Sequence, residues 1–404
     1  MTIRSITPDE ALAFRRAVMA GFHQTEVVDD AEWVKATLTP LDRVVAAFDG
    51  STIVATFHSF PTPLTLPGGR VIPAGAVTAV TCRPTHRRQG LLTRIITADL
   101  AASRDRGELA DVLIAAEWPI YGRFGYGPAT MSTSFELDAT ARFAEPGVGS
   151  VEFVDDATFR VEAPAIFERV RLDRAGMIGR DDLRWDALAD VRRRPEDKPW
   201  GGFRVLCRDE DGVAQAWASY KVESRWTDGR PHGTAEVADL CGASPTAEAR
   251  LWRFLTELDL ISTVKAVDRP VDDVLPWLLT DARAAKSSGA RDFLWVRPLD
   301  VAALLGARAY TTTGRVVLEV VDEQQLSAGR FELDASPAGA TCRATTSSAD
   351  LTLSVKALGA ACLGGVRLST LHAAGWLDEH EPCAVAAADG LLSWPVAPWC
   401  NTWF

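Results

Sequence analysis

The sequence contains one order of expected elements twice, and this internal repeat limits the possible folds more than any other feature. The first copy gives a strand, an Asp/Gly turn, two further strands and a helix, at residues 43–48, 49–50, 52–60, 74–82 and 87–106. The second copy gives the same order at residues 203–208, 209–212, 213–222, 234–241 and 247–258. Strands followed by amphipathic helices are typical of mixed α and β domains, so we predict two related domains of this class.

The two copies differ in the segment that joins the last strand to the helix. In the first copy, residues 83–90 read Arg-Pro-Thr-His-Arg-Arg-Gln-Gly, whereas residues 242–246 of the second read Gly-Ala-Ser-Pro-Thr. The first turn of a helix has free N–H groups and the positive end of the helix dipole, which together bind anions. Gly90 lets the backbone approach a ligand, and Arg87 and Arg88 add charge-assisted contacts. If this segment binds phosphate, only the first copy can do so.

A third region begins near residue 292, where the pattern changes to short strands and helices. The expected elements are strands at residues 316–321, 329–333 and 351–355 and helices at 356–362 and 367–374. At roughly 150 residues per domain, the 404 residues allow two to three domains. We predict domains at residues 1–145, 146–296 and 297–404, with the last an α+β domain.

Composition excludes several classes of protein. The net charge of −11 argues against a general nucleic-acid binder and favours cationic ligands. The alternative explanation is that the negative charge only keeps the protein soluble. The seven cysteines are scattered without a Cys-x-x-Cys pair, which predicts a reducing cytoplasm and no disulfide framework or zinc site. The N-terminus does not resemble a signal peptide, and the nearly uncharged tail at residues 384–404 contains prolines that disfavour a membrane span.

Two motifs resemble those of the GCN5-related N-acetyltransferases (GNATs). Residues 87–92 resemble the pyrophosphate loop of this superfamily, whose pattern is Arg/Gln-x-x-Gly-x-Gly/Ala. Residues 121–126, Tyr-Gly-Arg-Phe-Gly-Tyr, resemble a Tyr-x-x-x-Gly-Phe/Tyr motif whose first tyrosine is the general acid. A tyrosine hydroxyl has a pKa of about 10, so it stays protonated at neutral pH and can protonate a leaving thiolate. We assign this role to Tyr121 and a packing role to Tyr126; the reverse assignment and a purely structural turn are the alternatives.

Together these motifs are similar to one family, the enhanced intracellular survival (Eis) acetyltransferases, in residues 84–92 and 120–130. The resemblance implies a mixed α+β and α/β architecture. The expected chain consists of two tandem GNAT folds, of which the second is degenerate, and a third domain similar to sterol carrier proteins. It also implies a homohexamer that uses acetyl-CoA to acetylate amines, including several positions on aminoglycosides.

The resemblance assigns roles to residues of the first copy. Main-chain groups of Val80 and Cys82 are expected to hold the acetyl-pantetheine arm, and a backbone N–H there can stabilise an oxyanion. The side chain of Cys82 is expected to be a small buried group. The pyrophosphate loop is expected to comprise Arg87, Arg88, Gln89, Gly90 and Leu91. The six histidines show no metal-binding spacing, and we expect no metal.

The general base implied by the resemblance is the C-terminal carboxylate, here on Phe404. A free α-carboxyl has a pKa of about 3.5, and burial would raise that pKa and make the group a better base. The Trp-rich tail, including Trp399 and Trp403, favours docking over a frayed terminus.

The acceptor site is expected near residues 23–33, which are acidic and contain one tryptophan. Carboxylates attract ammonium groups, and an indole ring can stack on a sugar or a cation. Trp403 stands where some relatives of the family carry an acidic residue just before the terminal Phe. The candidate residues are Glu26, Asp29, Asp30, Trp33 and Trp403, with a solvated acidic loop as the alternative.

The leading hypothesis from sequence is therefore an acetyl-CoA-dependent N-acetyltransferase whose partner is a small-molecule or peptide amine. The runner-up acceptors are a protein lysine or a polyamine. The alternative that is not an enzyme is a carrier of acyl-CoA or lipid, in which the third domain is the functional part. Neither hypothesis includes nucleic acid or a membrane span.

Overall fold

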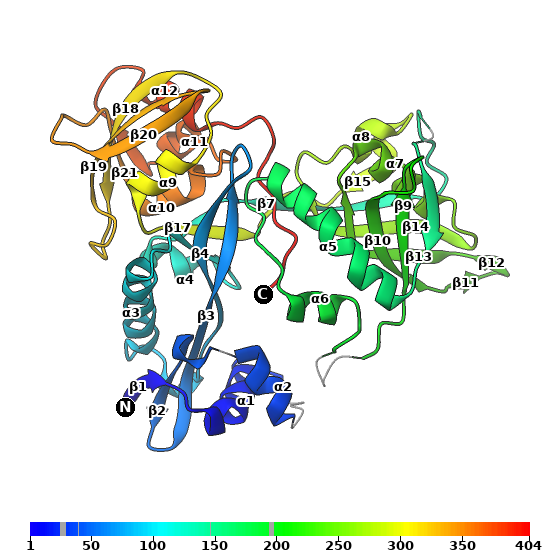
Figure 1. Ribbon diagram of the computed structural model, residues 1–404, viewed down its shortest axis with the longest axis horizontal. Coiled ribbons are helices and arrows are strands. Elements are labelled where there is room, and N and C mark those ends of the chain that lie inside the picture. Colours follow the sequence, from blue (N-terminus) through cyan, green and yellow to red (C-terminus); the bar gives the residue numbers. More distant parts are fainter. Residues whose placement is uncertain (25–29, 39, 146, 194–197) are drawn as a thin grey trace.

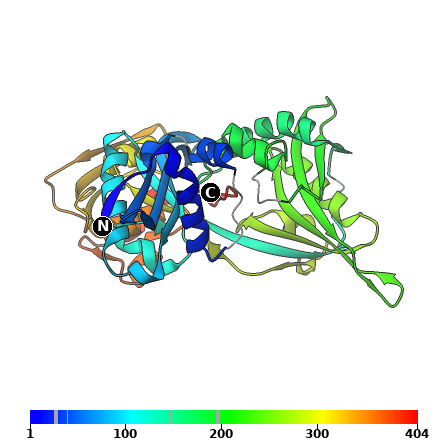
Figure 2. The ribbon, with the colours of Figure 1, turned by 90° about the horizontal axis from the view of Figure 1, so that it is seen from below.

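The computed structural model describes residues 1–24, 30–38, 40–145, 147–193 and 198–404. The chain forms three lobes, coloured blue to cyan, green, and yellow to red in Figure 1, and its C-terminus lies between them. Seen from below in Figure 2, the C-terminus again lies between the lobes. No helix in the described ranges is both long and apolar enough to cross a membrane.

The first lobe is a seven-stranded sheet with the order β1-β2-β3-β4-β5-β17-β6. Its strands from the N-terminal part of the chain are β1 (Thr2–Ser5), β2 (Val44–Asp49), β3 (Thr52–Leu66), β4 (Arg70–Cys82), β5 (Ala110–Ile114) and β6 (Gly127–Pro128). Its helices are α1 (Ala11–Gly21), α2 (Ala31–Leu38), α3 (Leu91–Asp105) and the single turn α4 (Trp118–Tyr121). The helix expected at 87–106 begins only at Leu91, because Arg88 and Gly90 adopt positive φ angles of 62° and 72°.

The second lobe repeats this arrangement in an eight-stranded sheet with the main order β15-β7-β14-β13-β10-β9-β8. Its strands are β7 (Met131–Asp138), β8 (Ser150–Phe153), β9 (Phe203–Arg208), β10 (Ala214–Glu223), β13 (Gly233–Gly242), β14 (Ile261–Pro270), β15 (Ala285–Ser287) and β16 (Arg291–Asp292), beside the separate hairpin of β11 (Trp226–Thr227) and β12 (Arg230–Pro231). Its helices are α5 (Asp156–Asp173), α6 (Asp182–Leu188), α7 (Pro245–Thr256) and α8 (Leu275–Leu278). Each sheet contains one parallel pair, β4 with β5 and β13 with β14, so the predicted repeat is confirmed.

The two sheets exchange strands. The strand β7 follows the first lobe in sequence but pairs with β14 of the second sheet, and β17 (Leu294–Pro298) follows the second lobe but pairs with β5 of the first. The predicted boundary between 145 and 146 therefore needs correction, since it separates β7 from its sheet. The boundary between 296 and 297 cuts through β17. Hydrophobic periodicity indicates a strand but does not identify its partner, which explains the difference.

The third lobe is a five-stranded sheet with the order β20-β19-β18-β21-β22, covered by helices (Figure 1). Its strands are β18 (Gly314–Val321), β19 (Gly329–Ser336), β20 (Gly339–Ala344), β21 (Leu351–Ser354) and β22 (Leu377–Glu379). Its helices are α9 (Val301–Ala307), α10 (Val355–Ala361), α11 (Leu368–Ala373) and α12 (Ala384–Leu392). The strands and helices enclose their own apolar core, which agrees with the predicted α+β domain.

A layer of charged side chains lies in the interior of the first lobe. Arg43 forms a buried ion pair with Glu108, and Arg106 lies 3.3 Å from Glu108 and 3.7 Å from Asp99. Asp111 of β5 is fully buried, and neither of its carboxylate oxygens has a hydrogen-bond partner. Burial raises the pKa of Asp111 well above its usual value, and the nearby Asp99 and Glu108 raise it further. Folding therefore favours the neutral form of the Asp111 carboxyl.

We predict that Asp111→Asn stabilises the protein increasingly as the pH rises. Because the raised pKa lets folded Asp111 keep a proton that the unfolded chain releases, stability falls as the pH rises above the ordinary carboxyl range. Asparagine does not titrate, so it removes this loss. Thermal unfolding of both proteins at about pH 5 and pH 8 measures the difference in Tm between the variant and the wild-type protein. Each kcal/mol of free energy of unfolding corresponds to roughly 2–4 °C in Tm. A gain from Asn that is equal at both pH values would contradict the prediction.

Candidate functional site

The strands β4 and β5 pair only over part of their length, and this leaves an opening in the first sheet. Their parallel register runs from Ala74↔Ala110 to Val77↔Leu113, whereas β4 continues to Cys82. A bulge at Ala79, which has a φ of 54°, shifts the register between β3 and β4. The Thr56 hydroxyl donates to the Ala79 carbonyl oxygen at 2.7 Å and stabilises the bulge. Beyond Val77, the backbone of β4 therefore has no strand partner on the β5 side and can bind a ligand.

Val80 and Cys82, the predicted main-chain contacts, lie on this unpaired part of β4 and are half-buried. Burial raises the pKa of the Cys82 thiol, and the nearby Arg87 only partly opposes this. The Cys82 thiol therefore lacks the lowered pKa of an activated nucleophile, and the main-chain role of Cys82 stays a prediction.

The predicted phosphate-binding loop follows β4 and ends at the N-terminus of α3. The side chains of Arg87, Arg88 and Gln89 are exposed, and an added Cβ on Gly90 would meet nothing within 4 Å. Since α3 begins at Leu91, the N–H groups of its first turn have no intrahelical partner and face the loop. Leu91 itself buries its side chain in the core, so only its backbone is available to a ligand. Exposed guanidinium groups beside free N–H donors suit a pyrophosphate.

Tyr121 ends α4, which follows β5 at the same opening. Its ring is buried and lies edge-on to Tyr126, with the ring centroids 6.1 Å apart. Burial raises the pKa of Tyr121 to about 12, with a smaller contribution from Glu117, so its hydroxyl stays protonated at neutral pH. Tyr126 is more deeply buried, and burial followed by the nearby Asp111 raises its pKa well above the usual value. Of the two tyrosines, Tyr121 is the more exposed to solvent, at 7% against 1%.

The C-terminal tail docks on the second lobe rather than on the third lobe from which it comes. The strands β13 and β14 stop pairing after Val237↔Ala266, and the tail contacts both strands just beyond that point. Asp239 of β13 accepts a hydrogen bond from the Asn401 amide at 3.0 Å. The main-chain oxygen of Asp268 in β14 accepts one from the Trp399 indole at 2.7 Å. The tail therefore enters the gap between the second pair of parallel strands.

Arg180 holds the tail in this gap. Its Nε donates to the Thr402 hydroxyl at 3.0 Å and its Nη2 to the Asn401 carbonyl oxygen at 3.2 Å. Its Nη1 forms an ion pair with Asp239 at 3.0 Å, and the guanidinium is almost fully buried. Beyond this clamp, the ring of Phe404 lies edge-on to Phe60 of β3, with the ring centroids 5.6 Å apart. The last residue thus reaches the first sheet, where Phe60 lies opposite Ala76 of β4.

Of the predicted acceptor residues, Asp30 and Trp33 contact each other at the start of α2, whereas Trp403 packs against Phe293. Asp30 caps α2, because its Oδ1 accepts the Trp33 N–H at 2.9 Å, and Trp33 packs against the core of the first lobe. Trp403 lies on the tail and is half-exposed, with its indole N–H donated to Asp268 at 2.8 Å. Glu26 and Asp29 lie outside the described residues.

Arg180, Asp239 and Phe60 are site residues that the sequence did not indicate. Arg180 lies in no motif, and its tail partners are more than two hundred residues away in sequence. The sequence could have indicated Asp239, because the repeat aligns its strand with the strand that contains Val80 and Cys82. Among the described residues, no three His, Cys, Asp or Glu side chains are placed to hold a metal ion.

Comparisons with known proteins agree with this geometry. The chain matches the acetyltransferase (GNAT) domain at residues 2–129 and again at 176–298, and the sterol carrier protein domain at 301–401. It is 40% identical to an uncharacterized N-acetyltransferase of Streptomyces avermitilis, over 100% of this chain and 98% of the relative. It is 36% identical to N-acetyltransferase Eis of Mycobacterium tuberculosis, over 85% of each chain.

The solved structures that resemble it include Eis1 from Mycobacterium abscessus, with a TM-score of 0.88, 31% identity and complete coverage of both chains. A GCN5-related N-acetyltransferase from Anabaena variabilis has a TM-score of 0.84 at 19% identity over both complete chains, which shows the same fold.

We predict that Arg180→Ala releases the tail. The substitution removes the charged donor to Asn401 and Thr402, and hydrogen bonds to charged groups contribute about 1.5–3 kcal/mol each. Carboxypeptidase should then remove Phe404 at least about tenfold faster, since cleavage follows the population of the undocked tail. Arg160→Ala is the matched control, because Arg160 pairs with Asp182 and Asp186 of α6. Equal cleavage rates in the two variants would show that Arg180 does not hold the tail.

Proposed function

Because the chain belongs to the Eis family of GCN5-related N-acetyltransferases, we propose that it transfers the acetyl group of acetyl-CoA directly to an amine, and that aminoglycosides are among its acceptors. The observation that carries the proposal is the parting of β4 from β5, with the loop at 87–90 and Tyr121 at the same opening. Family membership favours an enzyme over a carrier of acyl-CoA or lipid.

The opening fits the chemical parts of acetyl-CoA. The unpaired backbone at Val80 and Cys82 offers main-chain hydrogen bonds to the amide groups of the pantetheine arm. The exposed Arg87 and Arg88, together with the first turn of α3, offer charge and N–H donors to the pyrophosphate. Acetyl-CoA supplies the activated acetyl group as a thioester, and the residues of the chain bind, orient and move protons.

Direct transfer needs an acid and a base, and two groups of the chain supply them. As the neutral amine attacks the thioester carbonyl, a backbone N–H near Val80 stabilises the oxyanion. When the C–S bond breaks, Tyr121 donates its proton to the departing sulfur, and the proton that the attacking nitrogen loses as the amide forms restores the tyrosine hydroxyl. The carboxylate of Phe404 accepts the proton that the substrate ammonium group must lose. The contact of Phe404 with Phe60, beside β4, supports this role for the terminal residue.

The acceptor is proposed on the face of the first sheet that the tail reaches. The net charge of −11 favours a polycationic amine, such as an aminoglycoside, a polyamine or a lysine-rich peptide. Trp403 lies beside the terminal residue and presents a half-exposed ring that can stack on a sugar or cation. Protein lysine and polyamines remain the alternative acceptors, because the same acid and base serve any primary amine.

The experiment that tests the function is thiol release from acetyl-CoA, scanned over aminoglycosides, polyamines and lysine peptides. Tyr121→Phe should lower kcat by about 10²–10⁴-fold, because it removes the proton donor, and should leave the KM for acetyl-CoA nearly unchanged. A chain without Phe404 should lose a similar factor, most strongly at low pH where the amine arrives protonated.

Tyr126→Phe is the matched control for Tyr121→Phe. Its side chain lies in the same core but is almost fully buried, so its loss should leave most of kcat intact. A large loss in Tyr126→Phe with none in Tyr121→Phe would reverse the assignment. Thiol release that persists without Phe404 would keep the transferase and remove the terminal base from its mechanism. No thiol release with any amine would overturn the proposed function.

We further predict that Arg87→Ala and Arg88→Ala raise the KM for acetyl-CoA by about tenfold each, since a charge-assisted contact contributes about 1.5–3 kcal/mol. With S-acetyl-pantetheine, which lacks the pyrophosphate, the same variants should match the wild-type enzyme. Kinetics with both thioesters, at low and high salt, measure this difference. An equal loss with both thioesters would mean that the loop does not bind the pyrophosphate.

A further inference from the structure

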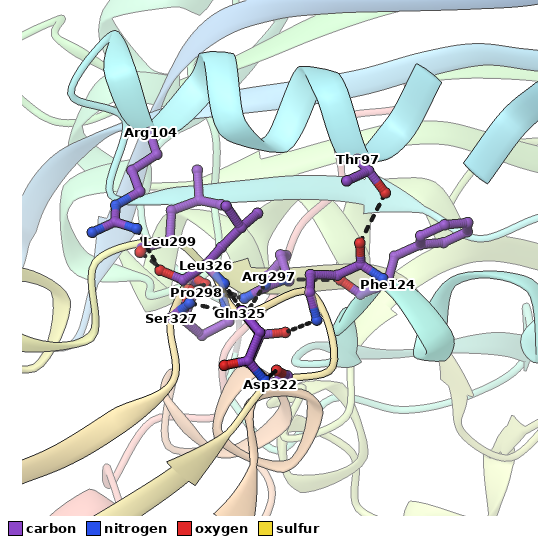
Figure 3. Close-up of polar contacts among 11 residues, drawn as sticks. Thr97, Arg104, Phe124, Arg297, Pro298, Leu299, Asp322, Gln325, Leu326 and Ser327 are labelled. Atoms are coloured by element: carbon purple, nitrogen blue, oxygen red, sulfur yellow. Dashed lines mark hydrogen bonds and ion pairs between the residues drawn. The ribbon is translucent and has the colours of Figure 1, made fainter. Parts of the chain in front are cut away.

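Arg297 of β17 is a fully buried charge that joins three segments of the chain (Figure 3). Its Nε donates to the Phe124 carbonyl oxygen at 2.7 Å. Its Nη2 pairs with the Asp322 carboxylate at 2.7 Å, and its Nη1 donates to the Ser327 hydroxyl at 3.1 Å. Phe124 belongs to the first lobe, whereas Asp322 and Ser327 belong to the loop between β18 and β19 of the third lobe.

The third-lobe loop is folded around Asp322 so that its carboxylate points at Arg297 (Figure 3). Oδ2 accepts the N–H groups of Leu326 and Ser327 at 3.0 and 2.8 Å, and Oδ1 accepts that of Gln324 at 3.0 Å. Burial alone would raise the pKa of Asp322, but Arg297 and these N–H donors hold that pKa below its usual value. The carboxylate therefore stays charged and paired.

The same loop also binds α3. The Thr97 hydroxyl donates to Gln324 Oε1 at 2.8 Å, and Arg104 Nη1 donates to the Leu326 carbonyl oxygen at 2.6 Å. The third lobe thus contacts the first sheet and the helix that begins at the phosphate-binding loop.

On the first-lobe side, Arg297 binds the turn that directly follows Tyr121. Phe124 ends the short 3₁₀ turn Gly122–Phe124, and Gly125 after it has a φ of 86°. A Cβ on Gly125 would lie 2.6 Å from Arg297 Nε and 2.7 Å from Val355 Cγ1 of α10. The turn that follows Tyr121 is therefore packed between the guanidinium and a helix of the third lobe.

We propose that the Arg297–Asp322 pair is a positioning device through which the third domain holds the Tyr121 turn in place for acetyl transfer. The proposal rests on the role of Tyr121 proposed above. A buried guanidinium needs its carboxylate partner, because an uncompensated charge in the interior is costly. If the pair is broken, the guanidinium shifts and releases the Phe124 carbonyl oxygen. The third domain would then affect the chemical step by a route separate from the C-terminal tail.

The test uses the full chain with Arg297→Lys, which keeps the charge but cannot reach Phe124, Asp322 and Ser327 at once. Hydrogen exchange of the backbone amides at residues 121–126 should be at least about tenfold faster than in the wild-type protein. The kcat for acetyl transfer should fall by about 10- to 100-fold, since small misplacements of a reacting group cost that much, with the KM for acetyl-CoA changed less than about twofold. Ser327→Ala, a milder change at the same guanidinium, should give smaller shifts of the same kind, and it replaces Arg297→Lys if that variant does not fold.

The matched control is Arg204→Lys in the second lobe. Arg204 is also buried, although its partner Asp156 is half-exposed, and it joins Asp156 to the Leu188 carbonyl oxygen, so its substitution should lower the Tm without changing kcat or exchange at 121–126. A similar loss of kcat in the control would mean that loss of stability alone explains the effect, and would overturn the proposal.

A double variant separates this proposal from the role of Tyr121. If the pair acts through Tyr121, Arg297→Lys should cause little further loss of kcat in the Tyr121→Phe background. An undiminished loss in that background, or unchanged hydrogen exchange at 121–126, would overturn the proposal. Full activity of Tyr121→Phe itself would instead contradict the proposed general acid, and hydrogen exchange alone would then decide whether the pair holds the turn.

Discussion

The exchange of strands between the two large sheets is the constraint on which the rest of the structure depends. β17 closes the first sheet beside β5, and β7 closes the second sheet beside β14. Neither sheet is complete without a strand from the other half of the chain. The exchange also brings Arg297, which follows the second lobe in sequence, into the interior of the first lobe. The strand β17, which lies next to β5 at the opening, therefore connects the three lobes.

Local features of the fold and of the site could be predicted from the sequence. The repeated strands, the presence of a helix after the basic loop and the placement of Val80 and Cys82 on one strand all depend on residues close in sequence. The predicted helix was four residues too long at its start because Arg88 adopts a positive φ, which side chains other than glycine rarely do.

The partners of distant segments could not be predicted in the same way. The strand at 294–298 is buried throughout, so its periodicity fits the first or second sheet equally well. Asp30 reads from sequence as an acidic group for a cationic substrate, whereas its carboxylate caps α2. The Arg180 clamp is a further case, since nothing near Arg180 in the sequence distinguishes this buried arginine from an exposed one. In each case, the deciding contact is tertiary.

The second copy has kept the geometry of an acetyltransferase cleft while changing its occupant. In each copy, two parallel strands are hydrogen-bonded over a short stretch and then separate. The pairing ends after Val77 in β4 and after Val237 in β13. In the first copy, the basic loop and the unpaired backbone suit the acetyl-CoA proposed above. In the second copy, the corresponding gap lacks the basic loop, and its Asp239 and Asp268 are paired with Arg180 and Arg291 and bind the tail. That gap instead binds the tail of the same chain, and the tail delivers Phe404 to the first sheet. The duplication has thus supplied one cleft for the proposed acyl donor and a second that positions the proposed base.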